Sequence, residues 1–553
     1  MIARGAAGRP RRRATRTALI VVASVSLGPA AARAQPLAPQ QVAAWPEAAA
    51  GGELTGYLRA LQGIGVVPRY PWSLRAFAPS EIDRLAPPDS APHPWAGRVV
   101  RRATTGGRIA VAGVRPEVGA VFNSAFPVGA NDAAVWAGRG LTLAAHGGIV
   151  ARAGVASLVV DPVVFWAQNA SFALMPNGQT DARRFGDGLY PSVVDHPQRF
   201  GDGAYARLDP GQTTLRAERW GAAIALSSAN EVWGPAEQLP LVLGSNAAGI
   251  PRLYVGSAAP VDIWIGHLHG RLELGRLSQS QYSSAADDQS VRQMASVVAV
   301  FVPRGLPGLE LGGSRFFHRV WPDGGPSIGD LFIPLGGLLK NRLRGSDATN
   351  GAENQIASAF VRLSLPPTLE AYAEFAREDH NADLRDLLLE PDHVSAYLLG
   401  LRRYWKTDDA RRITVLRGEL VNARVTHLAR VRSQSPFYIH AQLVQGHTQR
   451  GQFLGSPAAF GGAGSVIGVD RYHAGGRWSV EWTRSVQGQP LGEGAPPGQW
   501  DVAHAVAASA VRFRGRVELR AGIAGVYEID RHFEGDAFGV RLDLGARAAL
   551  GRR

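Results

Sequence analysis

Two segments of the sequence carry side chains that suit the binding of a carbohydrate. In residues 230–235, Asn230 and Trp233 follow an alternating strand, and the flat apolar ring of a tryptophan can stack on the C–H face of a sugar. The second segment contains His447 and Arg450, together with His440, Gln442, Gln445 and Gln449. Arginine and glutamine side chains suit hydrogen bonds to glycan hydroxyls and carboxylates. We predict Asn230, Trp233, His447 and Arg450 as glycan contacts, and a packed turn stays open as the alternative for residues 230–235.

Two further groups have the composition of a metal or catalytic site without the spacing. His267 and His269 share one face of a strand, but no third ligand follows at short spacing, so we predict no metal site. An acidic strand end contains Glu374, Glu378, Asp379 and His380. Glycosidase chemistry needs two carboxylates at a defined separation in a cleft, which one strand cannot establish. We interpret these acidic residues as structural charges that balance arginines.

A heptad of the form Arg-Phe-Gly-Asp-Gly-x-Tyr occurs twice, at residues 184–190 and 199–205. A Gly-Asp-Gly turn uses positive φ angles and lets the aspartate accept local N–H groups. A calcium loop would need more carboxylates, so we predict structural turns.

The sequence has no Walker phosphate loop and no H-E-x-x-H metal motif. We expect no catalytic residue and no cofactor.

The composition excludes several classes of protein. The chain has 553 residues, of which 45% are hydrophobic and 19% charged, with 66 Gly and no Cys. Low charge and abundant glycine do not suit a coiled coil or a soluble helical protein. Without cysteine there is no disulfide scaffold, no cysteine-ligated metal site and no thiol nucleophile.

The N-terminal segment is expected to be a cleaved signal peptide covering residues 1–34. It has a basic stretch from Arg4 to Arg16, an apolar stretch over 18–27 and an Ala-x-Ala site at 32–34. The apolar stretch is shorter than the roughly 20 residues of a spanning helix. The segment carries seven arginines and no acid, so the formal net charge falls from +13 to +6 on its removal. An exported chain with this charge is not expected to bind nucleic acid.

Two regions with different periodicity follow a linker expected at residues 35–52. Residues 53–106 are predicted to be a helical region, because Leu54, Tyr57, Leu58 and Leu61 form one apolar stripe. Glycines at 63 and 65 end the first predicted helix, Ser80 is the predicted N-cap of the second, and the prolines at 87 and 88 stop it.

Residues 107–553 change to a period of two, which predicts β-strands. Apolar and polar residues alternate in segments 357–365, 369–375, 477–483 and 538–548, and a single strand is predicted over 215–227. A soluble β-sandwich and a transmembrane β-barrel both produce this alternation. Long strands, an apolar face rich in Ala and Gly, and strands spread over some 440 residues favour the barrel. The predicted fold is an all-β antiparallel barrel with a small N-terminal helical plug.

Several segments resemble the capsule assembly Wzi family. They are residues 195–202, 208–211, 230–235, 245–251, 374–379 and 446–455. The helical pattern from Leu58 to Gly63, followed by Ser80, also fits. The similarity extends from about residue 53 to 455, and residues 190–255 are its most specific part.

This resemblance implies an outer-membrane barrel of about 18 antiparallel strands with a helical bundle at the periplasmic side. It also implies a lectin-like, non-catalytic role in holding capsular polysaccharide or exopolysaccharide at the cell surface. The expected partners are this polysaccharide, outer-membrane lipid and lipopolysaccharide, and the barrel-insertion machinery. One departure is the chain end, where Leu550 precedes Gly-Arg-Arg in place of the usual terminal aromatic residue.

Two other functions stay open from the residues alone. A porin-like channel would use the same strand pattern, although a helical plug argues against conduction. A hydrolase acting on lipid or glycan would need a positioned nucleophile or carboxylate pair, and none is evident.

Overall fold

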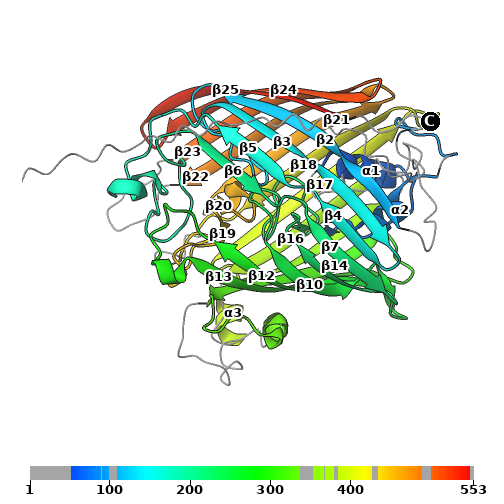
Figure 1. Cartoon of the computed structure of the whole chain (residues 1–553), viewed down its shortest axis with the longest axis horizontal. Coiled ribbons are helices and arrows are strands. Elements are labelled where there is room, and N and C mark those ends of the chain that lie inside the picture. The colour runs from blue at the N-terminus through cyan, green and yellow to red at the C-terminus, as the bar shows by residue number, and fades with distance from the viewer. Residues whose placement is uncertain are drawn as a thin grey trace, which may run out of the picture. The chain divides into compact units, whose positions relative to one another are not determined.

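The computed structural model describes residues 52–88, 90–96, 98, 109–336, 353–365, 368–378, 384–425, 434–488 and 500–548. The predicted signal peptide and all but the last residue of the predicted linker lie outside these ranges. The described residues form a closed antiparallel β-barrel with few helices (Figure 1). No helix among them is both long enough and apolar enough to cross a membrane.

The barrel contains long strands from both halves of the chain. Its segments are β2 (Ala110–Asn123), β3 (Gly140–Ala153), β4 (Ala156–Val160), β5 (Val163–Ala167), β6 (Tyr205–Asp209), β7 (Thr214–Arg219), β8 (Ala222–Ser227), β10 (Arg252–Ser257), β11 (Val261–Asp262), β12 (Gly266–Ser278), β13 (Val291–Pro303), β14 (Leu309–Val320), β15 (Glu353–Leu365), β16 (Leu369–Glu378), β17 (Ser395–Lys406), β18 (Ile413–Asn422), β21 (Ala463–His473), β22 (Gly476–Gly488), β23 (Trp500–Arg514), β24 (Val517–Arg531) and β25 (Gly535–Ala548).

These 21 segments make 18 strands, because three strands are each split in two: β4 with β5, β6 with β7, and β10 with β11. The first strand, β2, pairs antiparallel with the last, β25, with Glu117 opposite Arg547. This pairing closes the barrel and leaves no free sheet edge there.

The alternation predicted from the sequence places apolar side chains outward and polar ones inward. On β25, Phe538, Leu542 and Leu544 are exposed on the outer face, whereas Arg541 and Arg547 point into the lumen and make ion pairs there. This arrangement is the reverse of a soluble sandwich, in which the apolar face is enclosed. The predicted strands at 357–365, 369–375, 477–483 and 538–548 all lie within β15, β16, β22 and β25.

One predicted strand is wrong. Residues 215–227 form two strands, β7 and β8, joined by a tight turn at Trp220 and Gly221. Both turn residues have positive φ angles, 51° and 81°, and this conformation suits the twist of a two-residue hairpin. A bulky tryptophan at such a turn carries no recognisable turn signal.

The two ends of the barrel differ. The turn end, where β2 begins and β25 ends, has short connections such as 154–155, 220–221, 474–475 and 515–516. The loop end carries the long connections, including 168–204, 228–251 and 423–462. In Figure 1 the turn end lies to the right and the loop end to the left.

The N-terminal segment contains α1 (Glu53–Gly63), β1 (Leu74–Arg75) and α2 (Pro79–Leu85). The predicted apolar stripe of α1 is fully buried. It packs on lumenal side chains of the turn end, including Tyr404 and Tyr472. The predicted N-cap Ser80 is wrong, because α2 begins earlier: Ala78 is the N-cap, and its N–H donates to Glu81 Oε2 at 2.8 Å. Ser80 instead donates to Glu218.

The remaining helices are short and lie in loops. They are η1 (Asp181–Phe185), η2 (Asp287–Gln289), η3 (Ile328–Leu335), α3 (Leu384–Leu389) and η6 (Pro457–Ala459). Three two-residue strands complete the described elements: β9 (Val232–Trp233), β19 (Thr448–Gln449) and β20 (Gln452–Phe453).

Candidate functional site

Two long loops of the loop end fold inward and fill part of the lumen. We call residues 228–251 and 434–462 the loop layer. Their apolar side chains, such as Leu241, Phe437 and Tyr438, join lumenal residues of the wall in one buried core that includes Phe316 and Leu398. Segments that would be surface loops in an open channel thus form a core inside the barrel.

The loop layer is joined to the N-terminal segment by a small sheet within the lumen. Strand β1 pairs antiparallel with β9, so that Leu74 lies opposite Trp233 and Arg75 opposite Val232. Gly234 then donates its N–H to the carbonyl oxygen of Ser73 at 2.9 Å. The N-terminal segment and the loop layer are therefore in contact through backbone hydrogen bonds.

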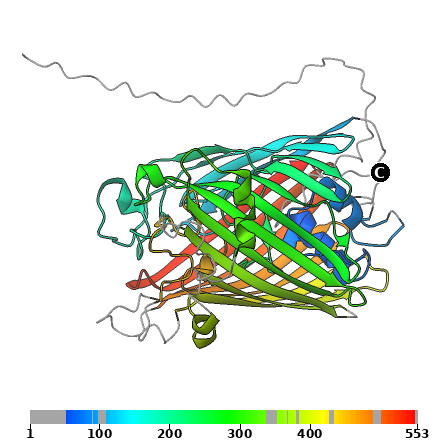
Figure 2. The ribbon, with the colours of Figure 1, turned by 90° about the horizontal axis from the view of Figure 1, so that it is seen from below.

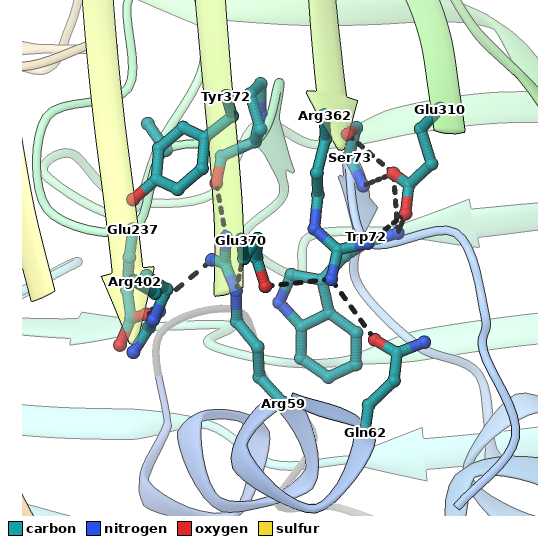
Figure 3. A network of polar contacts seen from close by, with 12 residues as sticks. Arg59, Gln62, Trp72, Ser73, Glu237, Glu310, Arg362, Glu370, Tyr372 and Arg402 are labelled. Carbon is teal, nitrogen blue, oxygen red and sulfur yellow. Dashed lines mark hydrogen bonds and ion pairs between the residues drawn. The ribbon is translucent and has the colours of Figure 1, made fainter. Parts of the chain in front are cut away.

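A buried network of charged side chains binds the N-terminal segment to the wall (Figure 3). Arg59 of α1 donates through Nε to Glu370 Oε1 of β16 at 3.2 Å and through Nη2 to the Pro235 carbonyl oxygen at 3.0 Å. Glu370 also accepts from Arg362 Nη2 and from the Tyr404 hydroxyl, each at 3.0 Å. Both ions of the Arg59–Glu370 pair are almost completely buried.

The network continues from Arg362 to the chain between the two helices. Arg362 forms an ion pair with Glu310 of β14. Glu310 accepts from the backbone N–H groups of Trp72 and Ser73 and from the Ser73 hydroxyl, at 2.8–3.1 Å. Breaking a buried ion pair leaves an uncompensated charge at a cost of about 3–5 kcal/mol, so these contacts hold the N-terminal segment strongly in place.

Part of the lumen stays open as a cavity of about 950 Å³. Its wall consists of β2, β3 and β21–β25, and its loop-end rim includes residues 128–135. Small side chains on β23, among them Ala503, Ala505 and Ala507, leave this space free. The cavity lies beside the loop layer, because Leu239, Ser245 and Ser456 also line it.

Charged side chains of both signs line this cavity. Arg541 pairs with Asp132 at 3.0 Å, and Arg520 pairs with Glu117 at 2.7 Å. His146 bridges Glu117 and Asp161 at 3.3 and 3.0 Å. Such a wall offers many hydrogen-bond donors and acceptors at fixed positions, which suits a ligand rich in hydroxyl groups.

The structure encloses two of the four predicted contact residues. Trp233 is completely buried, donates its indole N–H to Glu231 at 3.0 Å and packs against Phe316. His447 is also completely buried, stacks on Tyr438 and lies edge-on to Phe316. The two rings thus meet across Phe316 in the loop layer, and neither has a face open for stacking on a sugar.

The other two predicted residues lie apart from this pair. Asn230 lines the cavity, donates to the Ala247 carbonyl oxygen at 2.8 Å and accepts from Gln212 at 3.0 Å. Arg450 is partly exposed and pairs with Asp209 Oδ2 at 2.5 Å. Asn230 is therefore buried at the edge of the cavity, and Arg450 is the more accessible of the two.

The remaining candidates have structural contacts. His269 is buried and lies 3.3 Å from Glu81, and Glu374 and Glu378 are buried on the lumenal face of β16. Asp379 and His380 lie outside the described residues. Among those that are described, no group of three or more His, Asp or Glu is placed to hold a metal ion.

The two repeated heptads differ in how they use the aspartate. Asp187 accepts the N–H groups of Leu189 and Tyr190, as predicted for a structural turn. Asp202 instead pairs with Arg184 of the first heptad at 2.5 Å. The two copies of the heptad are therefore in contact through the Arg184–Asp202 ion pair.

His447 is expected to make the loop layer sensitive to acid. Burial, aided by nearby Arg292, lowers its pKa to about 4, against about 6.5 in an unfolded chain. The unfolded layer then binds more protons between these values, so stability is lost as the pH falls from about 6.5 to 4. Between pH 7 and 5, we expect the melting temperature of His447→Gln to fall less than that of the parent protein. Glutamine retains a hydrogen-bond donor for the Val242 carbonyl oxygen but does not titrate. Equal slopes in both proteins would contradict this assignment.

Comparison with known proteins gives one match to a family model. The model of capsule assembly protein Wzi matches residues 127–520, which is more than half of the chain. The chain belongs to the Wzi capsule assembly family. A comparison with curated proteins gives no match.

One solved structure shows the same barrel fold. The structure of Wzi from Escherichia coli, described as an outer membrane protein involved in group 1 capsule assembly and a carbohydrate-binding β-barrel, aligns with a TM-score of 0.57 at 14% identity. The alignment covers 89% of this chain and 97% of that one. A BenF-like porin from Pseudomonas fluorescens aligns with a TM-score of 0.41 at 9% identity, over 80% of this chain and 99% of the porin.

Sequence reasoning missed the cavity-lining residues as candidates for a site in this Wzi family member. Arg520 and Arg541 lie on the paired strands β24 and β25, whereas Glu117 lies on β2, far away in the sequence. Only barrel closure between β2 and β25 brings Glu117 to the two arginines. The sequence does show a charged face on the last strand, and this face indicates which side chains point into the lumen. It does not indicate which part of the lumen stays open.

Proposed function

We propose that this protein is an outer-membrane barrel that binds capsular polysaccharide or exopolysaccharide and helps attach it to the cell surface without catalysing a reaction. The single observation that carries the proposal is the Wzi family match over residues 127–520. The outward apolar face of the strands supports a place in a membrane, because a closed barrel satisfies all of its strand hydrogen bonds in lipid.

In this proposal, residues 1–34 are removed on export and residues 53–106 plug the periplasmic end of the barrel, which spans 107–553. The long loops then face the cell exterior, where polysaccharide is bound. Lipopolysaccharide and the barrel-insertion machinery are the further partners, and no cofactor is needed. The inward loop layer argues against the porin-like alternative, since it occupies lumen that a channel would leave open.

For the glycan contacts we propose a division of roles. Asn230, which borders the cavity, and Arg450, which is partly exposed, contact the glycan, while Trp233 and His447 hold the loop layer that presents them. The charged cavity wall beside Asn230 supplies further hydrogen bonds to the same ligand.

Titration of the purified protein with the exopolysaccharide of its own host tests these contacts. Asn230→Ala and Arg450→Ala are each expected to weaken binding by about fivefold, the loss of one net hydrogen bond of about 1 kcal/mol. Arg304→Ala is the matched control, because Arg304 forms an exposed ion pair with Asp262 at the turn end. Unchanged binding in both site variants would remove the contact assignment, and no binding by the parent protein would remove the proposed function.

A further inference from the structure

The short helix η3 lies outside the barrel. In both Figure 1 and Figure 2, η3 lies against the outer wall, in the connection between β14 and β15. It packs on β12, β13 and β14. The strand alternation identifies the outer face, because Arg292 and Phe316 reach the loop layer inside the lumen, whereas their neighbours Gln293 and Arg315 point away from it.

Polar side chains on this outer face hold η3 in place. Arg315 donates to the carbonyl oxygens of Pro334 and Gly336, at 3.1 and 2.6 Å. Asp330 of η3 accepts from Gln293 at 2.9 Å and pairs with Arg319 at 3.2 Å. Polar groups that face hydrocarbon without a hydrogen-bond partner are unfavourable. Here η3 covers these outward polar groups and supplies their hydrogen-bond partners.

The side of η3 that faces away from the barrel is apolar. Ile328 is 81% exposed, Phe332 53% and Leu335 60%. Nearby on the outer face, Arg377 of β16 donates to the carbonyl oxygen of Glu390 at 2.6 Å, just after α3, whose Leu388 and Leu389 are also exposed. The exposed leucines therefore lie near β16 and the η3 residues near β12, β13 and β14, on the same outer wall.

The motif G-x-S-x-G also falls on this segment, at residues 325–329. Ser327 caps η3, since its backbone N–H donates to Asp330 at 3.0 Å and it forms a capping box with that residue. A hydrolase elbow instead places its serine between a strand and a helix of an α/β sheet. The serine here has a structural role in starting η3.

The height of η3 along the barrel matches one edge of a membrane. Trp264 is 82% exposed in a connection of the turn end, as expected for an interfacial tryptophan. Arg276, opposite Gln293 in the sheet, lies 12 residues further along the chain. The strand itself runs from Gly266 to Arg276, which is 10 residues further along the chain. At about 3.3 Å per residue and a tilt of about 40°, this separation is about 25 Å, which is the height of the apolar band of such barrels. Arg276 is exposed, and arginine at this level suits anionic lipid headgroups.

We propose that η3 and α3 form an interfacial lipid anchor on one side of the barrel. Ile328, Phe332 and Leu335 of η3, with Leu388 and Leu389, insert among the acyl chains at the upper edge of the outer leaflet. Continuity with the outward apolar face of the strands and the arginines at headgroup level favour lipid as the occupant. This inference rests on the proposed outer-membrane location.

Single nitroxide labels test the anchor, because the chain has no cysteine to compete. Phe332→Cys, Leu388→Cys, Leu399→Cys and Asp409→Cys are labelled in the full-length protein and reconstituted into vesicles of phosphatidylcholine and phosphatidylglycerol. Leu399 is exposed on the outer face in the middle of β17, and Asp409 is exposed in a connection of the turn end. Collision with oxygen reports lipid, and collision with a nickel chelate reports water.

The labels at 332 and 388 are expected to collide with oxygen at a rate close to that of the label at 399, and with the nickel chelate several times less than the label at 409. Nickel accessibility at 332 and 388 equal to that at 409 would overturn the anchor, provided that 399 is shielded. Nickel accessibility at 399 would overturn the membrane location itself and so the proposed function. Dipolar broadening between labels at 332 would overturn lipid as the occupant and show a second copy of the chain on this face.

Discussion

Replacing Glu370 by alanine is expected to release the N-terminal segment from the lumen while the barrel stays folded. Glu370 lies between two buried arginines, Arg59 and Arg362, and accepts the Tyr404 hydroxyl as well. Its removal leaves two positive charges without their shared carboxylate, at a cost of about 3–5 kcal/mol. The strand ladder of β16 does not depend on this side chain, so the loss falls on the contact with α1.

Two measurements follow this release. Protease cleavage within 53–88 is expected to become at least tenfold faster, and planar-bilayer recordings are expected to show a higher conductance than that of the parent protein. Asp262→Ala is the matched control, because it removes an exposed carboxylate–arginine pair that solvent screens. If the Glu370→Ala protein has the cleavage rate and conductance of the parent, the buried charge network does not hold the N-terminal segment in the lumen.

The second large effect is expected from Trp233→Ala. The indole is fully buried between Glu231, Phe316 and the β1–β9 pairing, so truncation leaves a cavity in the loop layer. Loss of a buried tryptophan costs about 3–5 kcal/mol. We expect residues 228–251 to become sensitive to protease added outside the cell and glycan binding to fall with them.

Two variants separate this structural role from direct contact with the glycan. Trp233→Phe keeps most of the buried apolar surface and is expected to keep most of the binding and the protease resistance. Trp220→Ala removes a ring that is 88% exposed at the turn end and is expected to leave the loop layer intact. Lost binding in Trp233→Ala with a fully protected loop layer would favour direct stacking on the sugar.

The strand pattern was predictable because it depends on local alternation. In β25 each side chain faces either the surrounding medium or the lumen, and a period of two records that choice directly. The stripe of α1 was predictable for a similar reason, since Leu54, Tyr57, Leu58 and Leu61 all face one core. The hairpin at Trp220 was missed because positive φ in a bulky residue leaves no compositional signal.

The candidate site was less predictable because it depends on how the loops fold in three dimensions. Composition identifies Trp233 and His447 as residue types suited to a sugar. It does not predict that Phe316, on a distant strand, packs against both rings. The pairing of Arg59 with Glu370 spans 311 positions, so no local pattern predicts it. Open space in the lumen likewise depends on which wall the loops cover.

The most direct test of the account compares a deletion strain with its parent for cell-bound and released polysaccharide. The account predicts an unchanged total amount that shifts from the cell surface into the medium, with retention restored by the parent gene and not by the Trp233→Ala variant. Unchanged retention in the deletion strain would contradict the attachment role. The barrel fold would then stand with a different function, and the conductance of the parent protein would decide whether that function is transport.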